Sequence, residues 1–451
     1  MLTGARYYNM NTLTAQITPP MSADRAHEIA QALDLRALPR DFLDNPYPVY
    51  AALRQSEPFK RMPDGSYFFT RHADLVAVYR DAKVFSSDKQ VEFGPKYNHA
   101  PFNQPPYATA NGQAPLFEHH THSLVFNDAP RHTRVRHLIM GALTRRAIEA
   151  MEPGLVQLVD SLLDKIEAQG GGDLIEDFAS AIPVEIIGNL LDVPHADREP
   201  LRGWSLAILG ALEPSLTPDQ EALGNRSVSE FLTYLRELVA KRRRQPSDPE
   251  QDVLTCLIQG EENGDALSEV ELLQNCVFLL NAGHETTTNL IGNALISLQE
   301  WPEQRKQLQA DLKQAASDEV REQCLSLAVD EFLRFESSNQ LGNRRALQDT
   351  QVNGMDLPAG ALVTLCIGSA NRDPYIYDKP EQLNLRRTGN KHLAFGFGVH
   401  QCAGLSLARL EGRVAIGRFL QRFPDYQLTQ MPVRGGRARF RGFLHAPFSI
   451  R

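Results

Sequence analysis

Cys402 lies in a glycine-rich stretch whose residue types suit a metal-binding thiolate. The stretch reads Phe395-Gly396-Phe397-Gly398-Val399-His400-Gln401-Cys402-Ala403-Gly404, and a helical pattern follows it directly. The glycines leave little side-chain bulk beside the sulfur, Phe395 can shield it from water, and the N-terminus of the next helix favours the ionised thiolate. A buried structural cysteine beside a glycine turn would not need all of these features. We therefore predict that Cys402 ligates an iron, an arrangement that favours O–O cleavage.

A second segment, Ala282-Gly283-His284-Glu285-Thr286-Thr287, interrupts an apolar helical pattern. Glycine and threonine are poor helix formers, and the Thr286 hydroxyl can bond back onto the preceding turn and loosen it. We expect a local bulge that opens room for O₂, with Thr286 holding the dioxygen and Glu285 relaying protons from water. A bent surface helix with incidental polar residues is the alternative. His284 is expected to face water or the core.

Together these two segments resemble the cytochrome P450 family in its bacterial form. The first resembles the haem-binding signature, from which Phe397 departs, and the second resembles the acid-alcohol pair. The likeness extends to Asn45–Tyr50 and Ser369–Pro374, and it covers residues 41–451 as one domain after a partly ordered lead-in, 1–40. It implies a mainly α fold with a small β part, and haem b sandwiched between a long central helix and the cysteine loop. It also implies a monooxygenase that inserts one atom of O₂ into a hydrophobic small organic substrate.

The resemblance also implies a set of residues around the haem. Haem propionates need cationic or hydrogen-bond-donating partners, and four residues match family positions for that role: His132, Arg136, Arg344 and His400. Four uncharged residues are also expected to lie next to the haem: Phe395, Gly396, Ala282 and Gly283.

A Glu-x-x-Arg pair, Glu331 and Arg334, lies on one face of a predicted helix. It resembles the family's Glu-Arg-Arg core triad, which stiffens the region behind the thiolate loop. Arg387 would be its third member, although Leu383-Asn384 stands where the family has an aromatic-acid pair.

The substrate is expected to contact three regions: 91–126, the helix around residues 279–287, and Ser337-Ser338-Asn339-Gln340. Relatives often carry Pro-Val at 338–339, so Ser338 and Asn339 would make this wall more polar and offer a donor to the substrate. A fatty acid, a terpenoid or steroid, and an aromatic compound all remain open. The chain carries no flavin or iron–sulfur module, so a ferredoxin or flavodoxin with its reductase is expected to supply electrons at the Cys402 side.

Two other functions compete with this one. A haem-binding sensor or carrier needs no proton relay, so Glu285-Thr286 argues against it. A metal-dependent hydrolase would need a His-x-x-x-His or paired-carboxylate site, which the sequence lacks. Within the family, Glu285 also argues against the peroxide-using hydroxylases and the nitric oxide reductases, which typically lack this carboxylate.

The elements that must position these residues are mostly helices. Residues 130–345 read mainly as helical, with apolar periodicity through 272–295 and an amphipathic pattern over 325–333. Residues 361–367 form a short apolar run between glycines and predict a buried strand. Residues 66–70 predict an extended segment, and 73–80 a helix.

Val91–Phe126 is different, because it contains five prolines at a density that disfavours helices and central strands. We expect a lid or binding loop, or a disordered segment, there. The cluster His119, His120 and His122 within it is expected to lie in a solvated loop rather than to bind a metal.

The composition of the chain argues against several classes of protein. A net charge of −8 gives a nucleic-acid role no support. No two of the five cysteines stand in a Cys-x-x-Cys spacing, which disfavours a zinc ribbon. The sequence shows no long apolar run and no apolar signal at its start. We therefore expect a cytoplasmic monomer that neither crosses a membrane nor binds nucleic acid.

Overall fold

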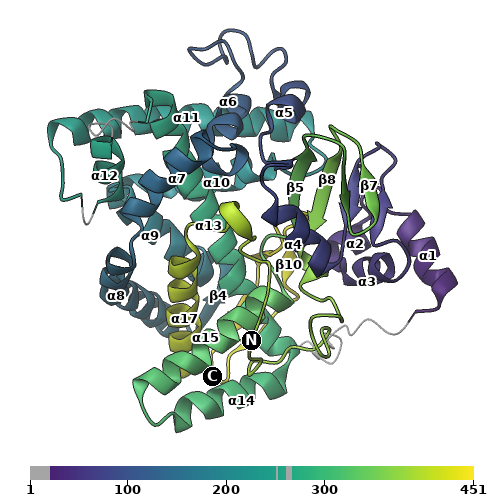
Figure 1. The fold of residues 1–451 in the computed structure, drawn as a ribbon. Helices are drawn as coiled ribbons and strands as arrows, with labels where there is room; N and C mark the ends of the chain where they lie inside the picture. The colour runs from purple at the N-terminus through teal and green to yellow at the C-terminus, as the bar shows by residue number, and fades with distance from the viewer. Residues whose placement is uncertain (1–20, 250–251, 261–266, 451) are drawn as a thin grey trace, which may run out of the picture.

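The structure is a computed structural model that describes residues 21–249, 252–260 and 267–450, and most of these residues lie in helices (Figure 1). The α-helices are α1 Ala23–Gln31, α2 Arg40–Asp44, α3 Tyr47–Ser56, α4 His72–Arg80, α5 Gln90–Tyr97, α6 Pro115–His122, α7 Arg131–Ala142, α8 Arg145–Gln169, α9 Ala181–Leu190, α10 Glu199–Gly210, α11 Pro218–Arg244, α12 Val253–Gln259, α13 Glu269–Glu300, α14 Pro302–Gln314, α15 Asp318–Phe335, α16 Ile367–Ala370 and α17 Leu405–Arg422. Shorter helical turns are η2 Leu124–Phe126, η3 Leu174–Ala179, η4 His195–Asp197 and η6 Gly398–His400.

The central element is α13, a helix of 32 residues. It begins at a capping box in which the Ser268 side chain accepts from the Glu271 N–H and the Glu271 side chain accepts from the Ser268 N–H. Most of its residues are buried, because α9, α10, α11 and α17 pack around it. The prediction of a helix through residues 272–295 is confirmed.

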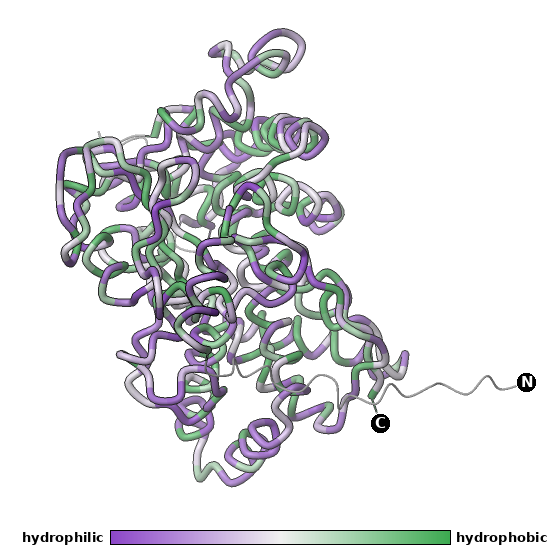
Figure 2. The backbone as a smooth tube through the Cα atoms, turned by 90° about the vertical axis from the view of Figure 1, so that its right-hand side faces the viewer, coloured by the Kyte–Doolittle hydropathy of each residue, from purple (hydrophilic) through white to green (hydrophobic). Residues whose placement is uncertain are grey.

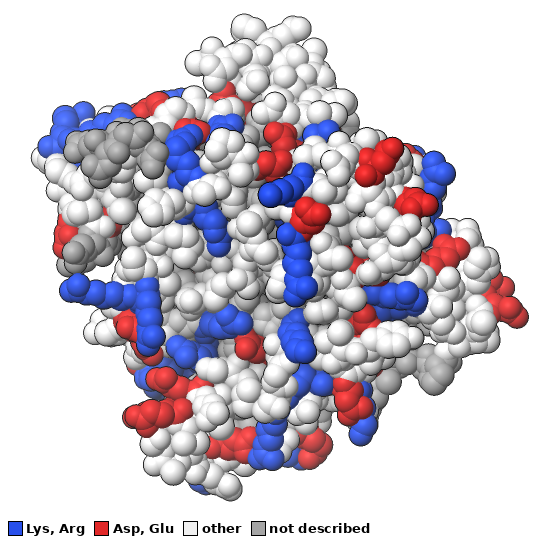
Figure 3. Space-filling view, in the orientation of Figure 1, with Lys and Arg blue, Asp and Glu red and all other residues white. Residues whose placement is uncertain are grey.

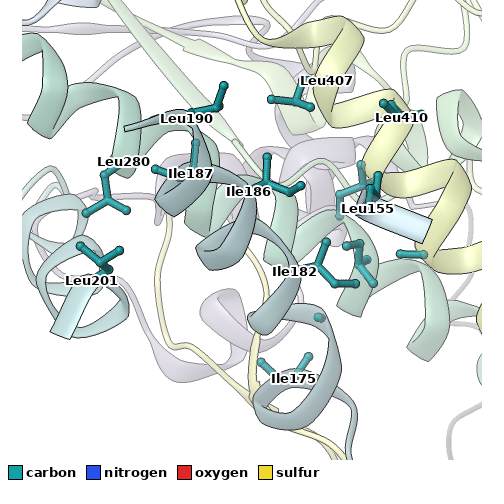
Figure 4. Packing of buried hydrophobic residues seen from close by; sticks show 14 of the residues in the cluster. Leu155, Ile175, Ile182, Ile186, Ile187, Leu190, Leu201, Leu280, Leu407 and Leu410 are labelled. Atoms are coloured by element: carbon teal, nitrogen blue, oxygen red, sulfur yellow. The ribbon is translucent and has the colours of Figure 1, made fainter. Parts of the chain in front are cut away.

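Apolar side chains from many helices meet in one large core. Figure 4 shows isoleucine and leucine side chains of α9 packed against those of α8, α10, α13 and α17. The hydropathy colouring in Figure 2 shows hydrophobic stretches on the inner segments and hydrophilic stretches on the outer loops. This packing fixes α13 relative to α17, the helix that follows the cysteine loop.

A five-stranded sheet lies at one side of the helical body, in the order β1-β2-β8-β5-β3. Strand β8 pairs parallel with β2 and antiparallel with β5, so that Arg344 lies opposite Val363. The sheet strands are β1 Phe59–Arg61, β2 Tyr67–Phe69, β3 Phe85–Ser86, β5 Leu341–Ala346 and β8 Leu362–Cys366. The remaining strands are β4 Gly171–Asp173, β6 Thr350–Val352, β7 Met355–Leu357, β9 Gln427–Leu428, β10 Val433–Arg434, β11 Phe443–His445 and β12 Pro447–Ser449.

These elements confirm the mainly helical fold with a small β part. The predicted strand over 361–367 is β8, the predicted amphipathic helix over 325–333 lies in α15, and the predicted helix over 73–80 is α4. In the predicted lead-in, residues 1–20 lie outside the described part of the chain. Helix α1 follows them and packs on α3 with Ala26 and Ala30 buried. Among the described residues, no helix is long and apolar enough to cross a membrane.

The region 91–126 does not form the extended loop that its prolines predicted. It contains α5 and α6 in addition to turns, with Pro95 inside α5 and Pro115 at the start of α6. A proline in the first turn costs no helical hydrogen bond, and contacts with α11 and α13 hold α6 in place. Tertiary packing therefore outweighs the local effect of the prolines.

The predicted solvated histidine cluster is also wrong. His119 and His120 are each 2% exposed. His119 lies within hydrogen-bonding distance of the Gln274 and Asn281 side chains, at 3.1 and 3.3 Å. Burial lowers the pKa of His119 to about 4 and that of His120 well below its usual value. Both rings are therefore neutral, and they pack among aromatic and amide side chains.

Candidate active site around the cysteine loop and helix α13

The cysteine loop owes its path to two glycines and to the start of α17. Gly396 and Gly398 have φ values of +65° and +73°, which side chains other than glycine rarely adopt. A Cβ on Gly398 would also lie 2.5 Å from the Tyr79 carbonyl oxygen of α4. The Cys402 N–H donates to the Phe395 carbonyl over 2.9 Å and closes the loop. The cysteine is thereby held three residues before the first residue of α17.

The surroundings of Cys402 shift the pKa of its thiol in opposite directions. Burial raises the pKa of Cys402, whereas a backbone hydrogen bond from Gly404 and the charges of Arg136 and Arg409 oppose the rise. Arg409 lies over the Phe395 ring, 4.9 Å from its centroid. The thiolate of Cys402 therefore needs a bound cation beside it to be stably ionised, although the Gly404 N–H and the two arginines already favour the ionised form.

Cations and imidazoles from three elements meet beside this loop. His132 and Arg136 come from α7, Arg344 from β5 and His400 from η6. The rings of His132 and His400 lie 3.9 Å apart between centroids. Burial and the nearby arginine charges lower the pKa of His132 to about 4 and that of His400 to about 2. The four residues predicted from the sequence to act together do lie together in the structure.

This cluster has positive charge and no acid in contact with its arginines, although the charge of nearby Asp128 acts on His132 and Arg344. Within the described part of the chain, neither Arg136 nor Arg344 has a carboxylate oxygen within 4.0 Å. The Arg344 guanidinium donates to the Asn343 carbonyl and lies 5.0 Å from the centroid of the Tyr79 ring. The buried His132 Nε2 atom has no hydrogen-bond partner. Because unpaired buried charges and donors cost free energy, this donor set fits an acidic group such as the two carboxylates of a haem.

One side of helix α13 is exposed along a narrow strip, called the open strip below, whereas its other sides are buried. Ala282 is exposed, and Phe278, Leu279, Gly283 and Thr286 are partly exposed, although the turns on either side are buried. These positions recur at intervals of three and four residues and therefore share one side of the helix. A Cβ on Gly283 would lie 2.5 Å from the Ile187 side chain of α9, so this glycine also permits close helix packing.

The Thr286 hydroxyl bonds back onto the helix as predicted, but the helix does not bulge. The hydroxyl donates to the Ala282 carbonyl over 2.6 Å, and α13 is a continuous α-helix through this turn. The Ser338 hydroxyl donates to the Thr286 carbonyl over 2.8 Å. The predicted role of Ser338 as a free donor for the substrate is therefore wrong, because its one hydroxyl proton is already used. Asn339 keeps an amide oxygen without a partner.

Glu285 has a partner that sequence reasoning missed. Both of its carboxylate oxygens accept from Arg437 Nη1, at 2.7 and 2.8 Å, and Arg437 also donates to the Leu206 carbonyl of α10. Burial raises the pKa of Glu285 to about 7, and the hydrogen bonds and charge of Arg437 oppose that rise. No short-range pattern could reveal this pair, because Arg437 lies in the loop between β10 and β11.

The predicted scaffold triad is present. Arg334 donates to both carboxylate oxygens of Glu331 at 2.8 Å, and Arg387 Nε donates to the same carboxylate at 3.0 Å. Glu331 and Arg334 side chains are fully buried. Bidentate pairs of this kind have fixed geometry, so the triad anchors the segment before the cysteine loop onto α15.

Comparisons with known proteins identify the family of this chain. A family model described as Cytochrome P450 matches residues 209–432. The chain is 33% identical over 410 residues to the biotin biosynthesis cytochrome P450 of Bacillus subtilis, covering 88% of this chain and 95% of that protein. It is 35% identical over 393 residues to the vitamin D(3) 25-hydroxylase of Pseudonocardia autotrophica, covering 86% and 89%. The structure of P450BioI in complex with hexadec-9Z-enoic acid ligated acyl carrier protein is similar, with a TM-score of 0.81 at 31% identity over 91% of this chain and 100% of that one.

Proposed function

The chain belongs to the cytochrome P450 family, and on that premise we propose that Cys402 is the ligand of its haem iron. As a member of this family it is a haem-thiolate monooxygenase that uses haem b and inserts one atom of O₂ into a small organic substrate. Gly396 and Gly398 give the cysteine loop its path, and Phe395 shields the sulfur from water. Arg136, Arg409 and the start of α17 favour the thiolate.

The propionates are held by His132, Arg136, Arg344 and His400. The observation that carries this proposal is the absence of any carboxylate in contact with Arg136 or Arg344 within the described residues, next to a buried His132 nitrogen that lacks a partner. A cluster built for internal ion pairs would contain its own acids. In this cluster no described carboxylate contacts the two arginines, so they can bind an acidic group from outside the chain.

When bound, the haem supplies O₂ activation, and its thiolate ligand favours O–O cleavage. The chain's own residues then deliver protons and shape the space over the open strip of α13. The small side chain of Ala282 leaves space over that strip, and the Thr286 hydroxyl lies on it. Glu285 has a pKa near 7, so its carboxyl can both accept and release a proton at neutral pH.

The substrate is a hydrophobic small molecule of the fatty-acid, terpenoid or steroid, or aromatic class. Two relatives support the first two classes: one is named a vitamin D(3) 25-hydroxylase, and P450BioI is seen with an acyl chain carried on a protein. In the 337–340 wall, Asn339 and Gln340 each keep a buried amide oxygen without a hydrogen-bond partner, so this wall can accept a hydrogen bond from a donor on the substrate.

Electrons come from a separate redox partner, a ferredoxin or flavodoxin with its reductase, which docks on the Cys402 side. Exposed Arg80 lies 5.3 Å over the ring of Phe397 in the cysteine loop, and Lys391 is also exposed just before that loop. Figure 3 shows Lys and Arg side chains across the middle of one face of the molecule. Such a surface attracts a partner with a negatively charged face. The monomeric state and the cytoplasmic location remain predictions.

Replacing Arg344 by Met tests the propionate assignment. We expect haem to leave the Arg344→Met protein at least tenfold faster than the wild type, as measured by transfer to excess apomyoglobin, because a buried propionate would lose its cation. Arg345→Met is the matched control, since Arg345 is the next residue of β5 and is paired with Glu92 at 3.4 Å. If both variants lose haem at the same rate, the assignment is wrong.

A further inference from the structure

Two positively charged side chains from distant segments meet at the turn between α10 and α11. Lys96 Nζ of α5 donates to the Glu213 carbonyl over 2.9 Å. The Arg439 guanidinium donates from Nε to the Leu212 carbonyl over 3.1 Å and from Nη1 to the Leu341 carbonyl over 2.8 Å. Among the described residues, no carboxylate forms an ion pair with either cation. Both positive charges are therefore held by neutral carbonyl groups.

The acids nearest to these cations do not balance them. The Glu213 carboxylate accepts from the backbone N–H groups of Ala438 and Arg439, at 2.8 and 3.1 Å. Burial and the charge of Arg439 lower the pKa of Lys96 to about 8, whereas the charges of Glu213 and Glu221 oppose the fall. Burial and the second cation thus outweigh the two acids. A bound anion would stabilise the charged form of Lys96.

A buried imidazole without a partner lies beside Lys96. His120 is 2% exposed, and its Nε2 atom has no hydrogen-bond partner. The rings of Phe93, Tyr97 and Phe126 surround it, with centroids 5.5, 5.4 and 5.8 Å from its own. Burial and the neighbouring positive charges, that of Lys96 included, keep the pKa of His120 well below its usual value. Its neutral ring can therefore donate a hydrogen bond from Nε2.

These cations lie at the far end of the wall that begins at the open strip of α13. The Ser338 hydroxyl donates to the Thr286 carbonyl over 2.8 Å, and the Gln340 N–H donates to the Arg439 carbonyl over the same distance. The segment 338–341 thus extends from the Thr286 turn to the Arg439 guanidinium. A molecule that lies along this wall with one end over the open strip has its other end beside Lys96 and Arg439.

We propose that the substrate carries a carboxylate that is bound by Lys96, with His120 Nε2 donating a second hydrogen bond and Arg439 adding positive charge. The inference rests on the proposed function and narrows its substrate class to hydrophobic acids, whether the apolar part is a fatty-acyl chain, a terpenoid or steroid, or an aromatic group. The rings around His120 suit the apolar atoms next to the carboxylate. A neutral molecule would leave Lys96 and His120 without partners, so the site discriminates an acid from its ester.

Matched pairs of an acid and its methyl ester test the proposal. Dodecanoic acid, abietic acid and naphthylacetic acid, each beside its methyl ester, are titrated into the ferric holoprotein at neutral pH, and their affinities are measured by isothermal titration calorimetry. We expect at least one acid to bind at least tenfold more tightly than its ester, because only the acid brings a negative charge to Lys96. An absence of acid preference in all three pairs overturns the proposal.

Replacing Lys96 by Gln locates the preference, because glutamine loses the charge but keeps a donor for the Glu213 carbonyl. We expect Lys96→Gln to weaken binding of the preferred acid at least tenfold and binding of its ester less than twofold. Lys96→Arg should restore most of the preference. Lys60→Gln is the matched control, since Lys60 is buried in β1, 3.4 Å from Glu57 and outside this group, and it should leave both affinities unchanged.

The outcomes separate this inference from the proposed function. An acid preference that persists in Lys96→Gln, or an equal loss of affinity for acid and ester, shows that Lys96 does not bind the carboxylate. Should Lys96→Gln not fold, His120→Phe must weaken binding of the acid instead, and unchanged binding there has the same meaning. Calorimetry does not depend on the haem spectrum. If the reduced protein with carbon monoxide lacks the band of a thiolate ligand, the proposed function is wrong, whatever the affinities.

Discussion

The cysteine loop and the Glu285 turn of α13 differ in the range of the contacts that position their chemistry. In the loop, Phe395, both glycines, Cys402 and the start of α17 lie within eleven consecutive residues. In α13, Glu285 is held by Arg437, which lies 152 positions away, and the Thr286 carbonyl is held by Ser338, 52 positions away. On the proposed assignments, iron ligation would be a property of one short segment, whereas proton delivery would depend on the docking of the C-terminal loop and of the wall at 337–340.

Replacing Thr286 by Ala should change the chemistry at α13 and leave the cysteine loop as it is, and it has the largest expected effect. We expect at least a tenfold fall in the fraction of electrons that reach product, with hydrogen peroxide released instead, because the hydroxyl on the open strip is lost. The carbon monoxide spectrum should not change, since the cysteine loop is untouched. Product and peroxide formed per electron pair give the measurement. Thr287→Ala, a buried neighbour, is the control, and equal coupling in both variants would contradict the assignment.

Replacing Arg437 by Met tests whether a residue far away in the sequence controls the pKa of Glu285, and its expected effect is smaller. Arg437 lowers the pKa of Glu285 at present, so its loss should raise that pKa above about 7, by roughly one to three units. The protonated carboxyl, and with it coupled turnover, should then persist to higher pH. Infrared titration of the carboxyl band that Glu285→Gln removes measures the shift, and a pKa that stays the same or falls would show that the pair does not control this carboxyl.

The same contrast explains what could be predicted from the sequence. Cys402 follows from a local motif, and the pair Glu331–Arg334 follows from a spacing of three residues on one helix. Arg387 and the set His132, Arg136, Arg344 and His400 are far apart in the sequence and followed only from the family resemblance; the structure brings them together. The Thr286 back-bond was also predictable, since it joins residues four apart. The expected bulge was not found, because packing keeps α13 regular through this turn.

The remaining features depend on tertiary contacts that no local pattern contains. His119 and His120 stand in a proline-rich segment that reads as a polar loop, yet ring packing and amide partners on α13 bury them. Nothing in the sequence distinguishes Arg437 from the other arginines near the C-terminus. His284 was expected to face water or the core, and only the fold shows that it borders a small cavity.

The central claim is that the sulfur of Cys402 ligates the haem iron, and the spectrum of the reduced protein with carbon monoxide tests it most directly. The account predicts a strongly red-shifted Soret band in the wild type and in Cys324→Ser, and loss of that band in Cys402→Ser. A band that persists in Cys402→Ser, or a wild-type spectrum typical of a nitrogen ligand, would contradict it.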